Sequence, residues 1–335
     1  MEKWSKNIMN KNYHDNPEQG WWQGRNDGDE WLQQRWWQVV EAIAFDEISK
    51  KDIQHSIVLA GFACDEGVVR NKGRAGAAKG PEALRHNCSN LPVYFSQEKK
   101  IYDTGNVVCT DKNLEAAQIS LSAIVSAILA RKGFPLLLGG GHEILYGHYC
   151  GTQKNFPGKN IGVINFDAHF DLRSDAETGA TSGSGFYQIA EDCKKEHNKF
   201  LYFALGIQEA GNTHELFERA KALDVDYILA HDFHYSKLEK IKAQLQIFLD
   251  KTEVVCLTID LDVFASGDAP GVSAPAAGGL RYDFLFYEVM RLLAGSGKIV
   301  SMDIAELNPE FDIDNRTAKL AANIIFDWVK LFYET

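Results

Sequence analysis

The chain has 335 residues, of which 35 are basic and 46 acidic, and its formal net charge is −11. This length allows one large α/β domain or two smaller ones. Because acidic residues dominate and no dense block of lysine and arginine occurs, we expect neither nucleic acid nor an anionic membrane as a partner. An anionic small-molecule substrate would need arginines placed at its site.

Six cysteines are scattered along the chain without a CxxC pair. This spacing is typical of reduced, mostly buried thiols rather than of a zinc finger or a disulfide framework. The N-terminal residues contain no apolar signal core, and no run reaches the ~20 apolar residues that a membrane helix needs. We therefore predict a cytoplasmic protein.

The first fifty residues differ from the rest in their content of tryptophan. Six tryptophans stand there among charged and amide residues: Trp4, Trp21, Trp22, Trp31, Trp36 and Trp37. Such a segment more often covers an apolar surface or an interface than forms a domain. We predict that residues 1–50 are an N-terminal extension packed on a single domain of residues 51–335.

From residue 56 onward, short apolar runs alternate with longer segments of helical period. The predicted strands are 56–62, 100–108, 135–139, 161–166, 200–206, 225–230, 254–259 and 298–303. Continuous rather than alternating apolar runs are typical of parallel strands covered on both faces. One predicted helix carries an apolar stripe from Leu114 to Ile128 and stops at Gly133 and Pro135; the others are 213–222, 236–250, 282–295 and 316–333. This order indicates an α/β fold with a doubly wound sheet of eight strands.

Three predicted strands are followed directly by residues that bind divalent metals. His142 follows 135–139 in a Gly-Gly-Gly-His-Glu segment; an Asp-Ala-His-Phe-Asp segment with Asp167, His169 and Asp171 follows 161–166; Asp260 and Asp262 follow 254–259. Since ligands of open α/β sheets gather beyond the carboxyl ends of the strands, these six side chains should converge. Four aspartates and two histidines are enough for a site of two metals.

The segment from Asp167 to Asp171 must curl to serve one site. An extended chain would separate the two aspartates by about 13 Å, whereas two catalytic metals lie roughly 3.5–4 Å apart. We therefore predict that the chain leaves the strand near His169 and folds Asp171 back. Oxygen and imidazole ligands without thiolate favour Mn²⁺, with Co²⁺, Fe²⁺, Ni²⁺ or Zn²⁺ as alternatives.

A water bridging two such ions is ionised near neutral pH and can attack an electrophilic carbon. The competing interpretation of the three glycines as a phosphate-binding loop is weaker, because Ile144 occupies the third glycine position and no Lys-Ser/Thr pair follows.

These motifs, together with Ser-Met-Asp-Ile-Ala-Glu-Leu-Asn-Pro at 301–309, resemble in order and spacing those of the ureohydrolases, the family of arginase, agmatinase and formimidoylglutamase. The resemblance covers residues 56–333. It implies an arginase-like three-layer αβα sandwich around an eight-stranded, mainly parallel sheet. It also implies two Mn²⁺ ions per subunit and a homo-oligomer, a trimer or hexamer. The implied metal ligands are His142, Asp167, His169, Asp171, Asp260 and Asp262.

Within the family, several stretches look most like the formimidoylglutamase branch: 22–27, 35–40, 70–78, 171–173 and 269–276. That branch hydrolyses N-formimidoyl-L-glutamate to L-glutamate and formamide in histidine breakdown. One departure separates this chain from arginases and agmatinases, which carry a proton-transferring His-Gly step in the loop after the second motif. Here the loop contains Ser182 in Thr-Ser-Gly-Ser-Gly.

Candidate roles follow from the charge of such a substrate. Glu306 is the candidate for orienting the cationic amidine by charge-assisted hydrogen bonds, and Asp171 for transferring the proton. Arg74 and Arg173, with Arg70 behind them, are the candidates for the two carboxylates, and Ser182 for a further contact. His148, His231 and His234 are interpreted as ordinary helix or loop residues.

Other functions stay open at this point. The nearest is the same chemistry on arginine, agmatine or another guanidino acid. A noncatalytic metal-binding oligomer of the same fold is a further alternative, and a single-zinc deacetylase would have little use for six ligands.

Overall fold

The structure is a computed structural model that describes residues 13–174 and 179–334. The eight predicted strands are confirmed as β3 (Ile57–Ala63), β4 (Ile101–Val108), β5 (Phe134–Leu138), β6 (Ile161–Phe166), β7 (Leu201–Ile207), β8 (Asp226–Leu229), β9 (Val254–Asp260) and β10 (Ile299–Ala305). The described chain adds two short strands, β1 (His14–Asp15) and β2 (Glu41–Ala42), so the sheet has ten strands rather than eight. Two-residue strands carry no detectable period, which is why the sequence did not predict them.

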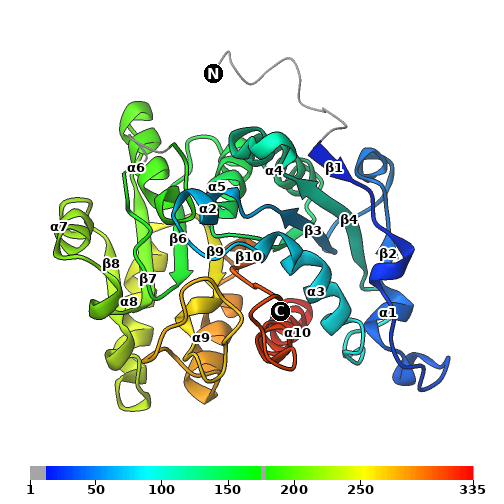
Figure 1. Cartoon of the computed structure of the whole chain (residues 1–335). Coiled ribbons are helices and arrows are strands. Elements are labelled where there is room, and N and C mark those ends of the chain that lie inside the picture. Colours follow the sequence, from blue (N-terminus) through cyan, green and yellow to red (C-terminus); the bar gives the residue numbers. More distant parts are fainter. Residues whose placement is uncertain (1–12, 175–178, 335) are drawn as a thin grey trace.

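The strands lie in the order β1-β4-β3-β5-β10-β9-β6-β7-β8, and β2 also pairs with β4 (Figure 1). All pairs are parallel except β1 with β4. Every residue of β5, β6 and β9 is buried. This explains the continuous apolar runs in the sequence, because helices cover both faces of these strands.

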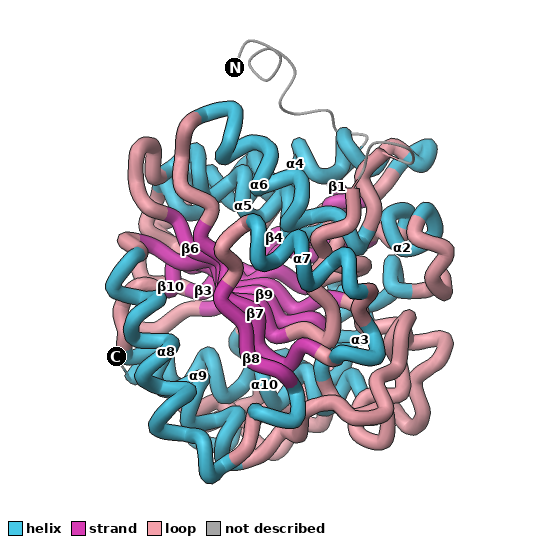
Figure 2. Tube along the Cα trace, turned by 90° about the vertical axis from the view of Figure 1, so that its left-hand side faces the viewer, coloured by secondary structure: helices cyan, strands magenta, loops and turns pink. Residues whose placement is uncertain are grey.

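Helices form a layer on each side of the sheet (Figure 2). One apolar core joins the sheet to α3 (Gly80–Cys88), α8 (Leu238–Lys251), α9 (Phe284–Gly295) and α10 (Arg316–Glu334). On the other face, two further cores join it to α4 (Leu114–Ala130), α5 (Ile144–Asn155), α6 (Gly185–Glu196) and α7 (His214–Ala222). The predicted three-layer αβα sandwich is confirmed.

Five of these helices agree with predicted ranges, but α3, α5 and α6 were not predicted. In α5 the apolar stripe is broken by Gly147 and Gly151, where the helix lies against α4. A Cβ at either position would come within 2.8 Å of an α4 backbone oxygen, that of Gln118 or Ser122. Glycine here permits close helix packing at a cost in helix propensity. The local sequence therefore does not predict a helix.

The described part of the N-terminal segment lies along the β4 edge. Its two strands pair with β4, and the indole Nε1 of Trp22 donates to Asp103 Oδ2 on β4 at 2.7 Å. Trp36, in the short helix α1 (Trp36–Val39), is buried in the core. Trp4 lies outside the described residues. These contacts agree with an extension packed on the core, and the boundary at residue 50 stays a prediction.

No helix among the described residues combines the length and apolar character needed to cross a bilayer.

The strand order places a switch point at the centre of the sheet. The chain leaves β5 through α5 and returns as β6, but β10 and β9 lie between these two strands. Parallel strands that diverge in this way leave a crevice beyond their carboxyl ends, where α/β proteins bind ligands. All three predicted metal motifs follow one of these four strands.

Candidate metal centre

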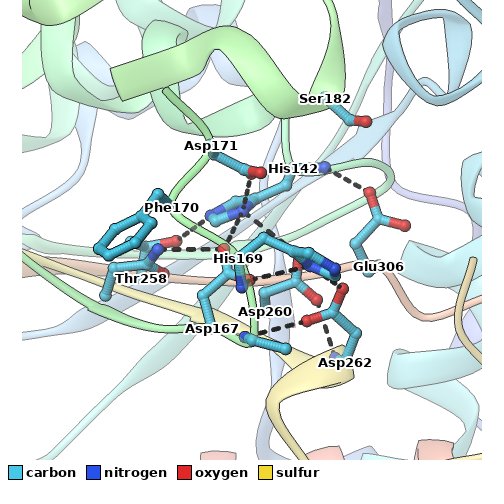
Figure 3. A network of polar contacts seen from close by, with 12 residues as sticks. His142, Asp167, His169, Phe170, Asp171, Ser182, Thr258, Asp260, Asp262 and Glu306 are labelled. Carbon is cyan, nitrogen blue, oxygen red and sulfur yellow. Dashed lines mark hydrogen bonds and ion pairs between the residues drawn. The ribbon is translucent and has the colours of Figure 1, made fainter. Parts of the chain in front are cut away.

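The carboxyl ends of the four central strands bring the predicted residues together. Ala305, the last residue of β10, is paired with Asp260, and Ile304 with Leu138, so Glu306 begins its loop beside the ends of β9 and β5. Asp167 follows β6, whose Phe166 pairs with Ile259. The convergence predicted from strand ends is therefore found in the structure (Figure 3).

The predicted ligands form two groups whose members could each hold a cation, with ligand atoms within 4.8 Å of one another. In the first group, His142 Nδ1 lies 3.1 Å from Asp167 Oδ2, 2.9 Å from Asp171 Oδ2 and 3.2 Å from Asp260 Oδ2. Four ligand atoms from three separate segments of the chain thus face a common point.

The second group consists of Asp167, His169 and Asp262. His169 Nδ1 lies 3.0 Å from Asp262 Oδ2 and 3.5 Å from Asp167 Oδ1. Asp167 therefore belongs to both groups through different oxygens, as expected for a carboxylate shared by two neighbouring ions.

The curl predicted after β6 is present. Asn212 clamps it from outside, since its Oδ1 accepts the Phe170 backbone N–H at 3.0 Å and its Nδ2 donates to the Ala168 carbonyl at 2.9 Å. Asp171 adopts a left-handed backbone conformation with φ of 49°, which is uncommon for a non-glycine residue. This turn brings its carboxylate back to His142.

The charge of this cluster fits divalent cations. Three buried carboxylates and that of the partly buried Asp171 face only two imidazoles, and a surplus of negative charge taken out of water is costly unless cations balance it. Burial and the nearby Asp167 carboxylate raise the pKa of Asp171 to about 6. Burial and the charge of Asp262 raise the pKa of Asp260 well above its usual value. The donor set therefore suits a pair of bound metals, which would stabilise the ionised forms.

Glu306 stands beside the ligand groups with one oxygen free. It has a φ of 69°, its Oε1 accepts the backbone N–H of His142 at 2.8 Å, and its buried Oε2 has no hydrogen-bond partner among the described residues. Burial and the neighbouring Glu143 raise its pKa well above the usual value. A buried unpaired carboxylate oxygen needs a cationic or donor partner.

A pocket of about 320 Å³ opens over the cluster. Its lining includes the side chains of five of the six predicted ligands, all except Asp167, together with Glu306 and the cations Lys72, Arg74 and Arg173. Lys72 and Arg173 are exposed, and no carboxylate pairs with either side chain among the described residues. Lys72 was not predicted, although it lies between the two predicted arginines of the 70–74 stretch.

The other predicted substrate residues are placed differently. Arg74 lines the pocket, but its guanidinium donates to the carbonyls of Val272 and Ser273 and lies 4.0 Å from the ring centroid of Phe311. Ser182 lines the pocket and is buried.

Arg70 does not line the metal pocket and belongs to a neighbouring one. Its guanidinium pairs with Glu66 at 3.2 Å and Glu115 at 2.7 Å. Its charge is therefore already balanced within the chain.

Below the metal edge lies a network that the sequence did not reveal. His148, on α5, is fully buried, and its Nδ1 lies 2.6 Å from Asp303 Oδ2 on β10. Although burial opposes it, contact with Cys256 and with the Asp303 carboxylate raises the pKa of His148 to about 10. The interpretation of His148 as an ordinary helix residue does not describe this environment. His231 lies in a short 3-10 helix, Ala230–Asp232, and His234 directly precedes another, Tyr235–Lys237; neither lines the pocket.

Comparison with known proteins agrees with this fold and site. Residues 55–330 match the Arginase family model. The chain belongs to the arginase family.

Its curated relatives include the formimidoylglutamase of Chromobacterium violaceum, which is 44% identical over 305 residues, covering 90% of this chain and 95% of the relative. That of Clostridium tetani is 41% identical over 91% of this chain and 92% of the relative.

Among solved structures, a Trypanosoma cruzi formiminoglutamase crystallised with Mn²⁺ is 28% identical, with a TM-score of 0.72 over 85% of this chain and 94% of that one. The formimidoylglutamase of Bacillus subtilis, at 23% identity and a TM-score of 0.75 over 84% of this chain and 88% of that one, shares the fold. Membership of this family and the two ligand groups together indicate a binuclear metal site in a small-molecule hydrolase.

Proposed function

We propose that this arginase-family protein is a formimidoylglutamase, which uses two Mn²⁺ ions to hydrolyse N-formimidoyl-L-glutamate to L-glutamate and formamide. One observation carries the proposal: a single pocket combines the two ligand groups, the free oxygen of Glu306 and two cations without carboxylate partners. Such a pocket is complementary to a substrate with a cationic amidine at one end and two carboxylates at the other. The identity to formimidoylglutamases over nine tenths of the chain supports it.

The ions would be held by His142, Asp167, His169, Asp171, Asp260 and Asp262, with Asp167 shared. When bound, they supply the Lewis acidity that makes a water molecule a nucleophile near neutral pH. The remaining chemistry belongs to side chains of this chain.

Glu306 orients the amidine. Its Oε1 is held by the His142 backbone N–H, so its Oε2 is positioned to accept a charge-assisted hydrogen bond from an amidinium N–H. In hydrolysis, water adds to the amidine carbon and the bond from that carbon to the glutamyl nitrogen breaks. Asp171, at the mouth of the first ligand group, is the residue we assign to accept the proton of the water and to deliver it to the leaving nitrogen.

The carboxylates of the substrate are assigned to Arg173 and Lys72, because both line the pocket and neither charge is balanced within the described chain. Arg74 and Ser182 complete the lining of the pocket. Arg70 supports the 66–74 segment through its two glutamates. The expected homo-oligomer is part of the same proposal.

A panel of substrates tests the function. Mn²⁺-loaded protein should turn over N-formimidoyl-L-glutamate with a kcat/KM above those for arginine, agmatine and simple guanidino acids. Release of urea from arginine at a higher kcat/KM would favour an arginase instead. Less than one equivalent of bound Mn²⁺, with no turnover of any member, would favour a noncatalytic scaffold.

A further inference from the structure

The two histidine ligands differ in what holds their second ring nitrogen. His142 Nε2 lies 2.9 Å from Thr258 Oγ1. Thr258 Oγ1 donates to Asp303 Oδ1 at 2.7 Å, and Asp303 Oδ2 lies 2.6 Å from His148 Nδ1. All four side chains are at most 1% exposed. We name this chain of contacts, from His142 through Thr258 and Asp303 to His148, the relay.

The direction of the hydrogen bonds in the relay determines the tautomer of His142. Since the Thr258 hydroxyl gives its proton to Asp303, its oxygen is left to accept from His142 Nε2–H. A proton on Nε2 leaves the lone pair of Nδ1 directed at Asp167, Asp171 and Asp260, as a metal ligand requires.

The relay also links His142 to three other elements of the fold. His142 lies in the loop between β5 and α5, Thr258 lies on β9 and Asp303 on β10. His148 lies on α5, the helix that starts two residues after His142. The far end of the relay is itself fixed, because His148 Nε2 lies 2.6 Å from Ser301 Oγ. The ring of His142 is thus anchored to the helix that its own loop begins.

His169 has no such anchor. Its Nδ1 faces Asp262 and Asp167, but its Nε2 forms no hydrogen bond within the described chain, and its side chain is 27% exposed at the pocket. Any effect of the relay on metal binding must therefore act on the His142 group and not on the His169 group.

We propose that Thr258, Asp303 and His148 are positioning residues for one of the two metals, the ion held by the His142 group, and that they set its affinity independently of the other ion. The proposal rests on the metal centre of the proposed function but not on its substrate. Outer partners of metal-bound histidines typically contribute about 10- to 100-fold in metal affinity. Thr258, the direct partner, should have the largest effect, and His148, three contacts away, the smallest.

The test is Mn²⁺ binding to the metal-free protein, measured by titration calorimetry as two resolved events. The His142→Asn variant identifies which event belongs to the His142 group. Thr258→Val, which keeps the shape but removes the hydroxyl, should weaken that event about 10- to 100-fold and change the other less than about twofold. Thr258→Ser, which keeps the hydroxyl, should bind at the His142 group as the wild type does. His148→Asn should weaken binding at the His142 group about threefold.

Asp103→Asn is the matched control. Asp103 is as buried as Asp303 and also lies in a buried polar network, but its partners are Arg85 and Trp22 and its strand, β4, lies beside β1 rather than at the centre of the sheet. It should leave both binding events unchanged. In the His142→Asn background, Thr258→Val should have no further effect on the remaining event.

The outcomes separate the two proposals. Two unchanged events in Thr258→Val, or two events weakened equally, would overturn the relay while leaving the metal centre intact. Failure of the wild-type protein to bind Mn²⁺ would overturn the metal centre itself. If Thr258→Val does not fold, as judged by circular dichroism, Asp303→Asn with its retained acceptor oxygen serves in its place, with the same predicted selectivity.

Discussion

Two clusters of largely buried charge, at different places along the sheet, are balanced in different ways. Asp103 on β4 pairs with Arg85 through both oxygens, at 2.7 and 2.8 Å, and also accepts from Trp22 and from the backbone of Gly105. At the metal edge, four carboxylates share two imidazoles, and Glu306 keeps an oxygen without a partner. A cluster that balances its own charge holds the fold together, whereas one that does not must take its balance from a ligand.

Replacing Asp167, the carboxylate common to both ligand groups, should have the largest effect on activity. Asp167→Asn should lower kcat by at least about 10³-fold, equivalent to about 4 kcal/mol, because both groups lose a charged ligand. The metal-free variant should be less stable than the metal-free wild type because, although burial opposes it, hydrogen bonds to His142 and His169 lower the pKa of Asp167 in the fold. Activity assays and urea unfolding measure the two quantities. Asp226→Asn, at an exposed ion pair with Lys251, is the control and should change neither.

The balanced cluster should respond in its stability. Asp103→Asn leaves Arg85 buried without its counter-charge, so the free energy of unfolding should fall by about 3–5 kcal/mol. The midpoint of urea unfolding would report this loss. A variant as stable as the wild type would show that the ion pair between Arg85 and Asp103 does not stabilise the fold.

Glu306→Gln tests the free oxygen alone, because glutamine keeps the acceptor for the His142 N–H and removes only the charge. We expect kcat/KM to fall about 100-fold, or about 2.7 kcal/mol, with Mn²⁺ affinity unchanged. An unchanged kcat/KM would exclude Glu306 as the partner of the amidine. A loss of Mn²⁺ affinity would instead make it part of the metal site.

The pH dependence of stability should reveal the unbalanced charge. The pKa of Asp171 is raised to about 6 and that of Glu143, by burial, to about 7. The folded state therefore holds protons that the unfolded chain releases near pH 4, so this stability is present at low pH and is lost as the pH rises through 6 to 7. Metal-free protein should be more stable at pH 5.5 than at pH 8, by on the order of 2 kcal/mol.

Metal-loaded protein should behave oppositely, because protons compete with the ions for the same ligands. Thermal unfolding of both forms between pH 5.5 and pH 8 measures this difference. A metal-free protein that gains stability as the pH rises would contradict a surplus of buried negative charge at this edge.

The same contrast holds on a smaller scale at the rim of the pocket, where Arg70 is balanced by two glutamates and Arg173 is not. Arg173→Gln should raise KM about tenfold with little change in stability. Arg70→Gln should change KM less than about twofold. Steady-state kinetics on both variants distinguishes the roles. A larger rise in KM for Arg70→Gln than for Arg173→Gln would instead assign substrate binding to Arg70.

Much of the fold was predictable because its signals are local. Buried parallel strands appear as continuous apolar runs, so all eight long strands could be located, whereas the two-residue strands β1 and β2 could not. Helix α5 escaped prediction because Gly147 and Gly151 serve its packing on α4 rather than its own propensity. The convergence of the six candidate metal ligands was predictable for a related reason, since their spacing and their place after strand ends are both local patterns.

The amino-acid sequence alone determined which side chains could bind metal and at which edge of the sheet they would meet. Only the tertiary structure decided which charges are already balanced, because ion pairs form through space. It joined Arg70 to Glu115 across 45 residues and His148 to Asp303 across 155. It also left Glu306 Oε2, Lys72 and Arg173 without counter-charges in the described chain. Local patterns thus specified the candidate ligands, and long-range pairing specified which of the remaining charged groups have no counter-charge in the described chain.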